Sequence, residues 1–255
     1  MEKNIEIYNK KENCNIKAKV FFKDLINKSN SIFIFCHGFC SGKGSDSIRI
    51  VANMLLECEI PSISFDFPGH IDSIQGTDKL KVDVCISYIN SVVEYVKEEY
   101  GNSIKISFYA ISFGAYILLN KLIGDNSYYD NIVLRSPAFN MKNILVKSLL
   151  KDSFEQYKRI GKAKAGHGGK IEIPYAFYED LVSHNLYDNY KEKRKILIIR
   201  KKDCISFQVF NNLLHIHRLQ LVIDFLSLLQ GAIHRRLHTT DSPERTCHRE
   251  LFLLL

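Results

Sequence analysis

The feature of this sequence that most restricts its fold is a repeated alternation of short apolar runs with segments of helical periodicity. The runs are rich in β-branched and aromatic residues, which indicates buried strands. They predict strands over 6–8, 16–22, 31–35, 62–65, 104–109, 132–134 and 195–199. The segments between them predict helices over 46–58, 79–100 and 115–123. Strands that are apolar on both faces and alternate with helices are typical of a parallel α/β sheet with helices on both sides.

Polar or small residues follow several of these strands at the point where each strand ends. They include His37 and Gly38, the stretch from Asp66 to Gly69, Ser112, and Ser136 with Pro137. In parallel sheets the chemistry lies at the carboxyl ends of the strands. We therefore expect these residues to converge on one cleft.

Ser112 lies in the stretch AISFG, between a predicted strand and a predicted helix. This is the G-x-S-x-G pattern of a nucleophile elbow, with Ala110 at the first glycine position. Small residues suit such a turn because strand and helix nearly touch. The free N–H groups of the helix start also suit a developing oxyanion. The alternative is an ordinary junction in which the serine only caps the helix.

Composition excludes several other classes of protein. No apolar run reaches the ~18–20 residues of a membrane span, and the polar start MEKNIEIYNKKENCN lacks the apolar core of a signal peptide, so we expect a cytoplasmic protein without a membrane association. The seven cysteines show no CxxC pairing and predict free thiols with no metal site. The net charge of +7 is spread over lysine-rich segments without the arginine and aromatic clusters of a nucleic-acid interface.

Residues 138–194 interrupt the alternation of strands and helices. The stretch MKNILVKSLLKDSFEQYKRI predicts a helix, GKAKAGHGGK predicts a flexible loop, and 173–190 is rich in tyrosine and phenylalanine. An excursion of this size predicts a cap over the cleft. Its aromatic side chains favour a substrate wall, with Phe177 and Tyr178 as substrate-binding candidates. The predicted organisation is a core of 1–137 and 195–235, a cap of 138–194 and an atypical tail of 236–255.

Four features, taken in order, resemble the α/β-hydrolase superfamily. They are the strand ending at His37-Gly38-Phe39, the segment FDFPGHIDS over 65–73, the elbow over 110–114, and Asp203 after a late strand. The segment IPYAFYEDL over 173–181 is similar to that of small bacterial cinnamoyl or feruloyl esterases. The resemblance implies an α/β-hydrolase fold and a serine esterase without a cofactor.

The resemblance also implies residue roles. Ser112 would attack an ester carbonyl, a histidine would transfer the proton, and Asp203 would orient that histidine. Backbone N–H groups of Phe39 and Phe113 would form the oxyanion hole. Asp180 is a rival acid that fits less well.

Three residues in the strand-end loops have structural interpretations. His37 would brace its loop, because it precedes the oxyanion residue. Asp66 and Asp72 would fix the turn after their strand.

The base follows Asp203, and the sequence offers several histidines there. His234, in GAIHR, fits a glycine–small–x–histidine turn best, with His238 as the next candidate. The preceding strand would be 219–223, but the apolar stretch FLSLLQ intervenes. Residues 213–255 contain twelve leucines, five of the nine histidines and no lysine, which suggests an altered C-terminal segment, divergence being the alternative. Resequencing the coding DNA would distinguish the two.

The predicted function is hydrolysis of small or hydroxycinnamoyl-type carboxylic esters through a Ser112–His234–Asp203 triad. A thioesterase or acyltransferase would use the same residues. A second class of function is a catalytically impaired α/β-hydrolase-like protein that binds a ligand in the cleft. The expected partner is a small-molecule ester, and the sequence does not indicate the oligomeric state.

Overall fold

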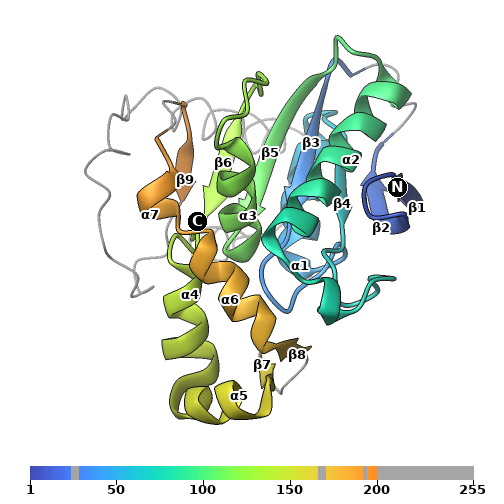
Figure 1. Ribbon diagram of the computed structural model, residues 1–255. Coiled ribbons are helices and arrows are strands. Elements are labelled where there is room, and N and C mark those ends of the chain that lie inside the picture. The colour runs from blue at the N-terminus through green and yellow to red at the C-terminus, as the bar shows by residue number, and fades with distance from the viewer. Residues whose placement is uncertain (24–28, 166–170, 192–193, 200–255) are drawn as a thin grey trace, which may run out of the picture.

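The computed structural model describes residues 1–23, 29–165, 171–191 and 194–199, and is drawn as a ribbon in Figure 1. Within these residues the main sheet has the strand order β1-β2-β4-β3-β5-β6-β9. β1 (Glu2–Asn9) and β2 (Cys14–Phe21) form an antiparallel hairpin at one edge, and β2 is also antiparallel to β4. From β4 to β9 all neighbouring strands are parallel. The bounds of these strands are β3 Ser31–Cys36, β4 Ser62–Phe65, β5 Lys105–Ile111, β6 Ile132–Arg135 and β9 Leu197–Ile199.

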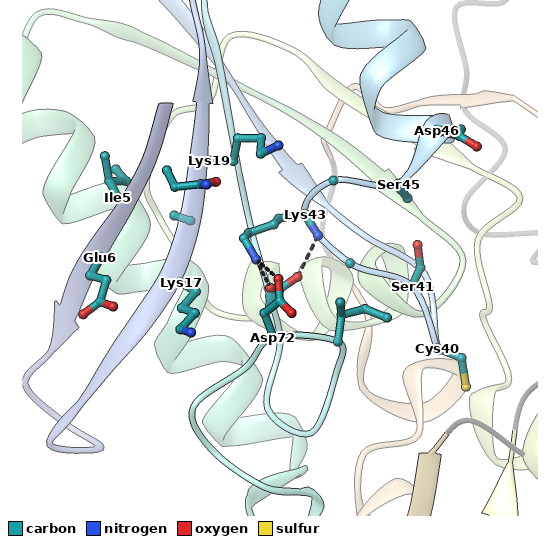
Figure 2. A pocket seen from close by; sticks show the side chains of 16 residues that line it. Ile5, Glu6, Lys17, Lys19, Cys40, Ser41, Lys43, Ser45, Asp46 and Asp72 are labelled. Carbon is teal, nitrogen blue, oxygen red and sulfur yellow. Dashed lines mark hydrogen bonds and ion pairs between the residues drawn. The ribbon is translucent and has the colours of Figure 1, made fainter. Parts of the chain in front are cut away.

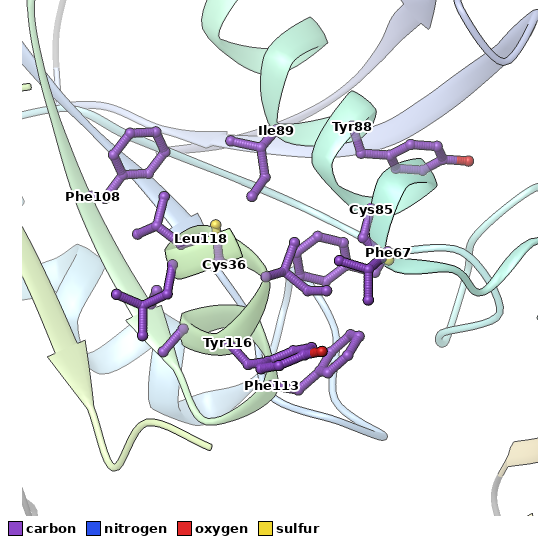
Figure 3. Packing of buried hydrophobic residues seen from close by; sticks show 14 of the residues in the cluster. Cys36, Phe67, Cys85, Tyr88, Ile89, Phe108, Phe113, Tyr116 and Leu118 are labelled. Carbon is purple, nitrogen blue, oxygen red and sulfur yellow. The ribbon is translucent and has the colours of Figure 1, made fainter. Parts of the chain in front are cut away.

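The side chains of β3 show how helices cover both faces of the sheet. Ile32 and Ile34 are fully buried in a cluster with α2 (Val82–Tyr100) and α3 (Phe113–Leu122). Phe33 and Phe35 belong to a second cluster with α1 (Asp46–Glu57). Because successive strand residues face opposite sides, the continuous apolar run of β3 reaches both layers. Figure 3 shows part of the larger cluster, where Phe108 of the sheet faces α2 and α3. The mostly parallel sheet between helices confirms the predicted α/β class.

Outside 138–194, the described strands and helices lie within about four residues of their predicted bounds, and one shifted helix start has an identifiable cause. The helix expected from residue 79 begins at Val82, because Thr77–Lys79 forms a separate 3₁₀ turn, η2. Lys81 is extended, and the Asp180 carboxylate accepts the N–H of Val82 at 2.6 Å. A side chain remote in sequence therefore caps this helix, which the local pattern could not indicate.

The segment 138–194, predicted as a cap, gathers its helices beside one end of the sheet (Figure 1). Its predicted long helix is interrupted, because Lys151 has φ 48° between a π-helical turn and the following helix. Part of the predicted flexible loop is also a strand, since Lys162–Ala165 pairs antiparallel with Ile171–Pro174. The elements are α4 Met141–Ile144, η3 Leu145–Leu150, η4 Lys151–Ser153, α5 Phe154–Ile160, β7 Lys162–Ala165, β8 Ile171–Pro174, α6 Tyr175–Ser183 and α7 Leu186–Asn189. The division into core, cap and tail stays a prediction.

Among the helices that the structure describes, none is long and apolar enough to cross a membrane.

Candidate active site

Ser112 stands between the last residue of β5 and the first residue of α3, in a conformation that is rare for a residue with a side chain. Its φ is 48° and its ψ is −107°. Three backbone hydrogen bonds hold it there. Its N–H donates to the Arg135 carbonyl at 3.0 Å, and its carbonyl accepts from Tyr116 and Ala138, both at 3.1 Å. Strained backbone of this kind persists only where the surroundings fix it, and it concentrates at functional sites.

Gly114 explains why a small residue follows the serine. A Cβ atom at this position would lie 2.4 Å from the Cys36 carbonyl oxygen and 2.5 Å from that of His37. The first turn of α3 therefore rests directly on the end of β3. This close approach brings the β3 loop beside Ser112, because a Cβ built on Gly38 lies 3.7 Å from the Cβ of Ser112.

Phe39 and Phe113, the two predicted oxyanion donors, lie beside the serine. Phe39 occupies a turn closed by the Ser41 N–H on the Gly38 carbonyl at 3.2 Å, in which Cys40 has φ 59°. The rings of Phe39 and Phe113 contact each other edge to face at 5.4 Å. Phe113 begins α3, so its N–H lacks a partner within the helix. Within the described part of the chain, neither N–H donates a backbone hydrogen bond.

His37 braces the loop that carries Phe39. The Phe67 N–H donates to Nε2 at 3.0 Å, so Nδ1 carries the proton and donates to the Gly38 carbonyl at 2.8 Å. The ring is fully buried, and burial lowers the pKa of His37 to about 4. Both nitrogens are occupied, which supports the interpretation of His37 as a bracing residue and not as the base.

Asp66 and Asp72 meet on a buried lysine. The Lys43 ammonium donates to Asp66 at 2.6 Å and to Asp72 at 2.9 Å (Figure 2). Burial alone would lower the pKa of Lys43, but the hydrogen bonds to both carboxylates outweigh it and raise that pKa. The two acids therefore fix the loops of β3 and β4 to each other, as the structural interpretation predicted. Lys43 itself was not singled out by the sequence reasoning.

His70 is a second residue of this site to which the sequence reasoning gave no role, although it lies in the FDFPGHIDS segment. Its ring stacks on Phe113 at 5.8 Å and contacts Phe39 edge to face at 5.3 Å. Nδ1 donates to the Pro68 carbonyl at 2.9 Å, and Nε2 has no hydrogen-bond partner among the described residues. Burial, followed by the charge of nearby His37, lowers the pKa of His70 to about 3, so the ring stays neutral at physiological pH.

The two substrate-binding candidates of the cap lie in different surroundings. Phe177 is completely buried, stacks parallel on Phe39 at 5.8 Å and contacts Phe113 at 6.1 Å. Phe177 therefore packs against the turn that contains Phe39. Tyr178 is half-buried and contacts Phe154 and Tyr175 of the cap. Contact of either side chain with a substrate stays a prediction.

Asp203 and His234 lie outside the described residues, as does His238. β9 pairs parallel with β6, with Ile199 opposite Arg135, so the carboxyl end of β9 lies at the same end of the sheet as Ser112. The rival acid Asp180 caps α2 through one carboxylate oxygen. It therefore has an observed structural role.

A groove with a volume of about 880 Å³ lies between the β1–β2 hairpin and the loop that follows Phe39 (Figure 2). Its wall carries charges of both signs, among them Lys17, Lys19, Glu6 and Asp46. Ser112 is not among the residues that line it. The groove therefore borders residues 40–46, which follow Phe39, and not the serine. Across the described residues, no group of three or more His, Cys, Asp and Glu side chains is placed to hold a metal ion.

Solved structures resemble this arrangement as a whole. Est1E from Butyrivibrio proteoclasticus, solved with ferulic acid bound, superposes with a TM-score of 0.61 at 18% identity, covering 76% of this chain and 77% of that one. A putative hydrolase from Agrobacterium vitis S4 gives a TM-score of 0.60 at 14% identity, with 80% and 90% covered. The Pyrococcus furiosus esterase Pf2001 gives 0.58 at 17% identity, with 91% and 78% covered.

This chain has the α/β-hydrolase fold. Identities this low establish the fold alone. No protein-family model matches the sequence, and no curated protein matches it. Ser112 lies between β5 and α3, at the centre of the predicted nucleophile elbow.

Proposed function

We propose that the protein is a serine hydrolase that cleaves carboxylic esters. One observation carries the proposal: Ser112 is held at φ 48° in the elbow, directly beside the Gly38–Ser41 turn. An ordinary helix cap needs no left-handed serine, and here the side chain makes no capping hydrogen bond.

In the proposed mechanism the Ser112 hydroxyl attacks the ester carbonyl and forms a tetrahedral intermediate. The N–H groups of Phe39 and Phe113 stabilise its oxyanion. His234 takes the serine proton and returns it to the leaving alcohol, while Asp203 orients His234. Water then hydrolyses the acyl-enzyme by the reverse sequence of proton transfers.

The esterase structures at similar TM-score support this assignment, as does the charge-neutral, aromatic setting of the elbow. Est1E was solved with ferulic acid bound. Phe39, the partly exposed ring of the cluster with Phe113 and Phe177, would suit a small or hydroxycinnamoyl acyl group. We therefore propose that the substrates include hydroxycinnamate esters as well as short-chain esters.

A fluorophosphonate probe tests the nucleophile directly. The wild-type protein should be labelled, and the Ser112→Ala variant should not. Turnover of p-nitrophenyl esters, methyl hydroxycinnamates and a thioester series would then separate an esterase from a thioesterase. Absence of labelling in protein with a native circular dichroism spectrum would refute the hydrolase and favour the ligand-binding alternative.

The base is tested by His234→Ala, with His238→Ala as the matched control. His234→Ala should lower turnover by about 10³-fold or more while thermal stability is nearly unchanged, because loss of a triad member leaves only residual catalysis. Normal turnover in His234→Ala with loss in His238→Ala would reassign the base to His238.

A further inference from the structure

Lys43 is a buried cation with an unusual set of partners for a loop residue. Only 8% of its surface is exposed, and Asp66 is fully buried. The ammonium bridges Asp66 at the end of β4 and Asp72 further along the same loop. Figure 2 shows these contacts among the side chains that line the groove.

The main chain of Lys43 is held as firmly as its side chain. Its N–H donates to the other oxygen of Asp66 at 2.7 Å, and its carbonyl accepts the Ser64 hydroxyl at 2.6 Å. Lys43 lies inside a turn closed by Ser45 N–H on the Gly42 carbonyl at 3.1 Å. This turn follows directly after the Gly38–Ser41 turn that contains Phe39. The position of the second turn therefore limits the position of the first.

The contact between the two loops leaves no space for a side chain at Gly42. A Cβ on Gly42 would lie 2.7 Å from Ile71 Cγ1 and 2.9 Å from an Asp66 carboxylate oxygen. Between Phe39 and Gly42, Cys40 has φ 59°, a value that turns of this kind usually assign to glycine. Such a conformation needs support from its surroundings, which His37 supplies before the turn at Gly38 and Lys43 supplies after it.

We infer that Lys43 is a positioning residue for the Phe39 N–H, an inference that rests on the proposed hydrolase function. Burying an ion pair costs desolvation, so an apolar pair would stabilise the fold equally well. A lysine instead fixes the loop by directional bonds to two carboxylates. An oxyanion donor must lie about 2.7–3.1 Å from the developing charge, so a loosened turn would slow the chemical step without weakening substrate binding.

The test is steady-state hydrolysis of p-nitrophenyl butyrate, normalised to active sites titrated with a fluorophosphonate. Lys43→Met should lower kcat about 10–100-fold, because a displacement of about 1 Å costs up to about 10² in rate. KM should change less than about twofold, since ground-state binding does not use the donor. Lys43→Arg should recover most of kcat, because its side chain can reach both carboxylates.

Lys19→Met is the matched control. Lys19 lines the same groove, but its ammonium pairs with Glu2 of the hairpin at 2.7 Å. The Lys19→Met variant should leave kcat unchanged. Because Lys43→Met leaves Asp66 buried without its partner, the neutral double variant Lys43→Gln with Asp66→Asn provides a second test if the single variant does not fold, with the same expected loss of kcat.

Wild-type kcat per titrated site in a folded Lys43 variant would overturn the inference, because a purely structural role changes only the number of active sites. Equal losses in Lys19→Met would also overturn it, since a general charge effect would then explain the data. If the wild-type protein hydrolyses no ester and Ser112 is not labelled, the proposed function fails and this inference fails with it.

Discussion

The contact between α3 and the end of β3 at Gly114 makes a quantitative prediction. In Gly114→Ala the new methyl group would meet three backbone atoms of Cys36 and His37 at 2.4, 2.5 and 2.6 Å. These atoms end a central strand that is hydrogen-bonded on both sides, so they cannot move aside locally. Overfilling a packed site costs about 1–3 kcal/mol, and occasionally more.

Alanine also favours a helix over glycine by about 1 kcal/mol, which offsets part of that cost. The overlaps of 2.4–2.6 Å put the cost at the upper end of that range, about 3 kcal/mol, so we expect a net loss of about 2 kcal/mol in the free energy of unfolding. With a urea dependence of about 3 kcal/mol per molar, the midpoint should fall by about 0.7 M. The sequence contains no tryptophan, so far-UV circular dichroism is the suitable signal.

Gly38→Ala is the matched control, because its Cβ would meet its nearest atoms at 3.7 Å, an ordinary contact distance. Its unfolding midpoint should stay within about 0.3 M of the wild type, since such a substitution changes stability by about 0.5 kcal/mol or less. Its activity should nevertheless fall, because one of those atoms is the Cβ of Ser112. A Gly114→Ala midpoint equal to that of the wild type would refute the close packing that places Ser112.

Three further predictions concern the loops and the cap. Ile71 is a β-branched residue with φ 36° and 62% of its surface exposed, so its backbone is strained. Because asparagine tolerates this conformation, Ile71→Asn should raise the free energy of unfolding, measured by urea denaturation, by about 1 kcal/mol, and an unchanged midpoint would contradict the strain. The pKa of His70 falls from 6.5 to about 3 on folding, so the contribution of His70 to stability is complete above pH 6.5 and is lost as pH decreases toward 3. His70→Phe should therefore reduce the pH dependence of the unfolding midpoint between pH 7 and 5, and an unchanged pH dependence would contradict the burial of a neutral ring. Phe177→Ala should destabilise the protein by about 3–4 kcal/mol in urea denaturation, and Tyr178→Ala by markedly less, because of these two side chains only Phe177 is completely buried. Equal losses of stability would contradict the packing of Phe177 on Phe39.

The sequence predicts the sheet and the elbow well because both depend on local pattern. Apolar runs identify the strands of this sheet, and small residues on each side of Ser112 identify the tight turn. The two oxyanion candidates, Phe39 and Phe113, come from the resemblance to α/β-hydrolases. All three residues lie together in the structure.

Contacts between distant loops leave no such local pattern. Lys43 sits in the polar stretch SGKGS, where a lysine normally indicates a solvated surface, and only the tertiary structure buries it against Asp66. The cap shows the same effect, since the β7 strand forms through its pairing with β8 and the start of α2 depends on Asp180. The aromatic side chain of Phe177 makes it a candidate from the sequence, but its burial against Phe39 depends on how the segment 138–194 packs on the rest of the chain.

The register between β3 and β5 accounts for the assembly of the site. Cys36 pairs with Ala110, so the next residues along the two strands bring Gly38 opposite Ser112. A slip by one residue would turn Phe33 and Phe35 toward α2 and α3, and would expose Ile32 and Ile34 to the smaller cluster around α1. The different sizes of the alternating Ile and Phe side chains of β3 therefore favour the observed register, and the register in turn fixes which residue of the β3 loop faces Ser112. The relative position of Ser112 and the Gly38–Ser41 turn is thus a consequence of core packing, which the missing side chain of Gly114 permits.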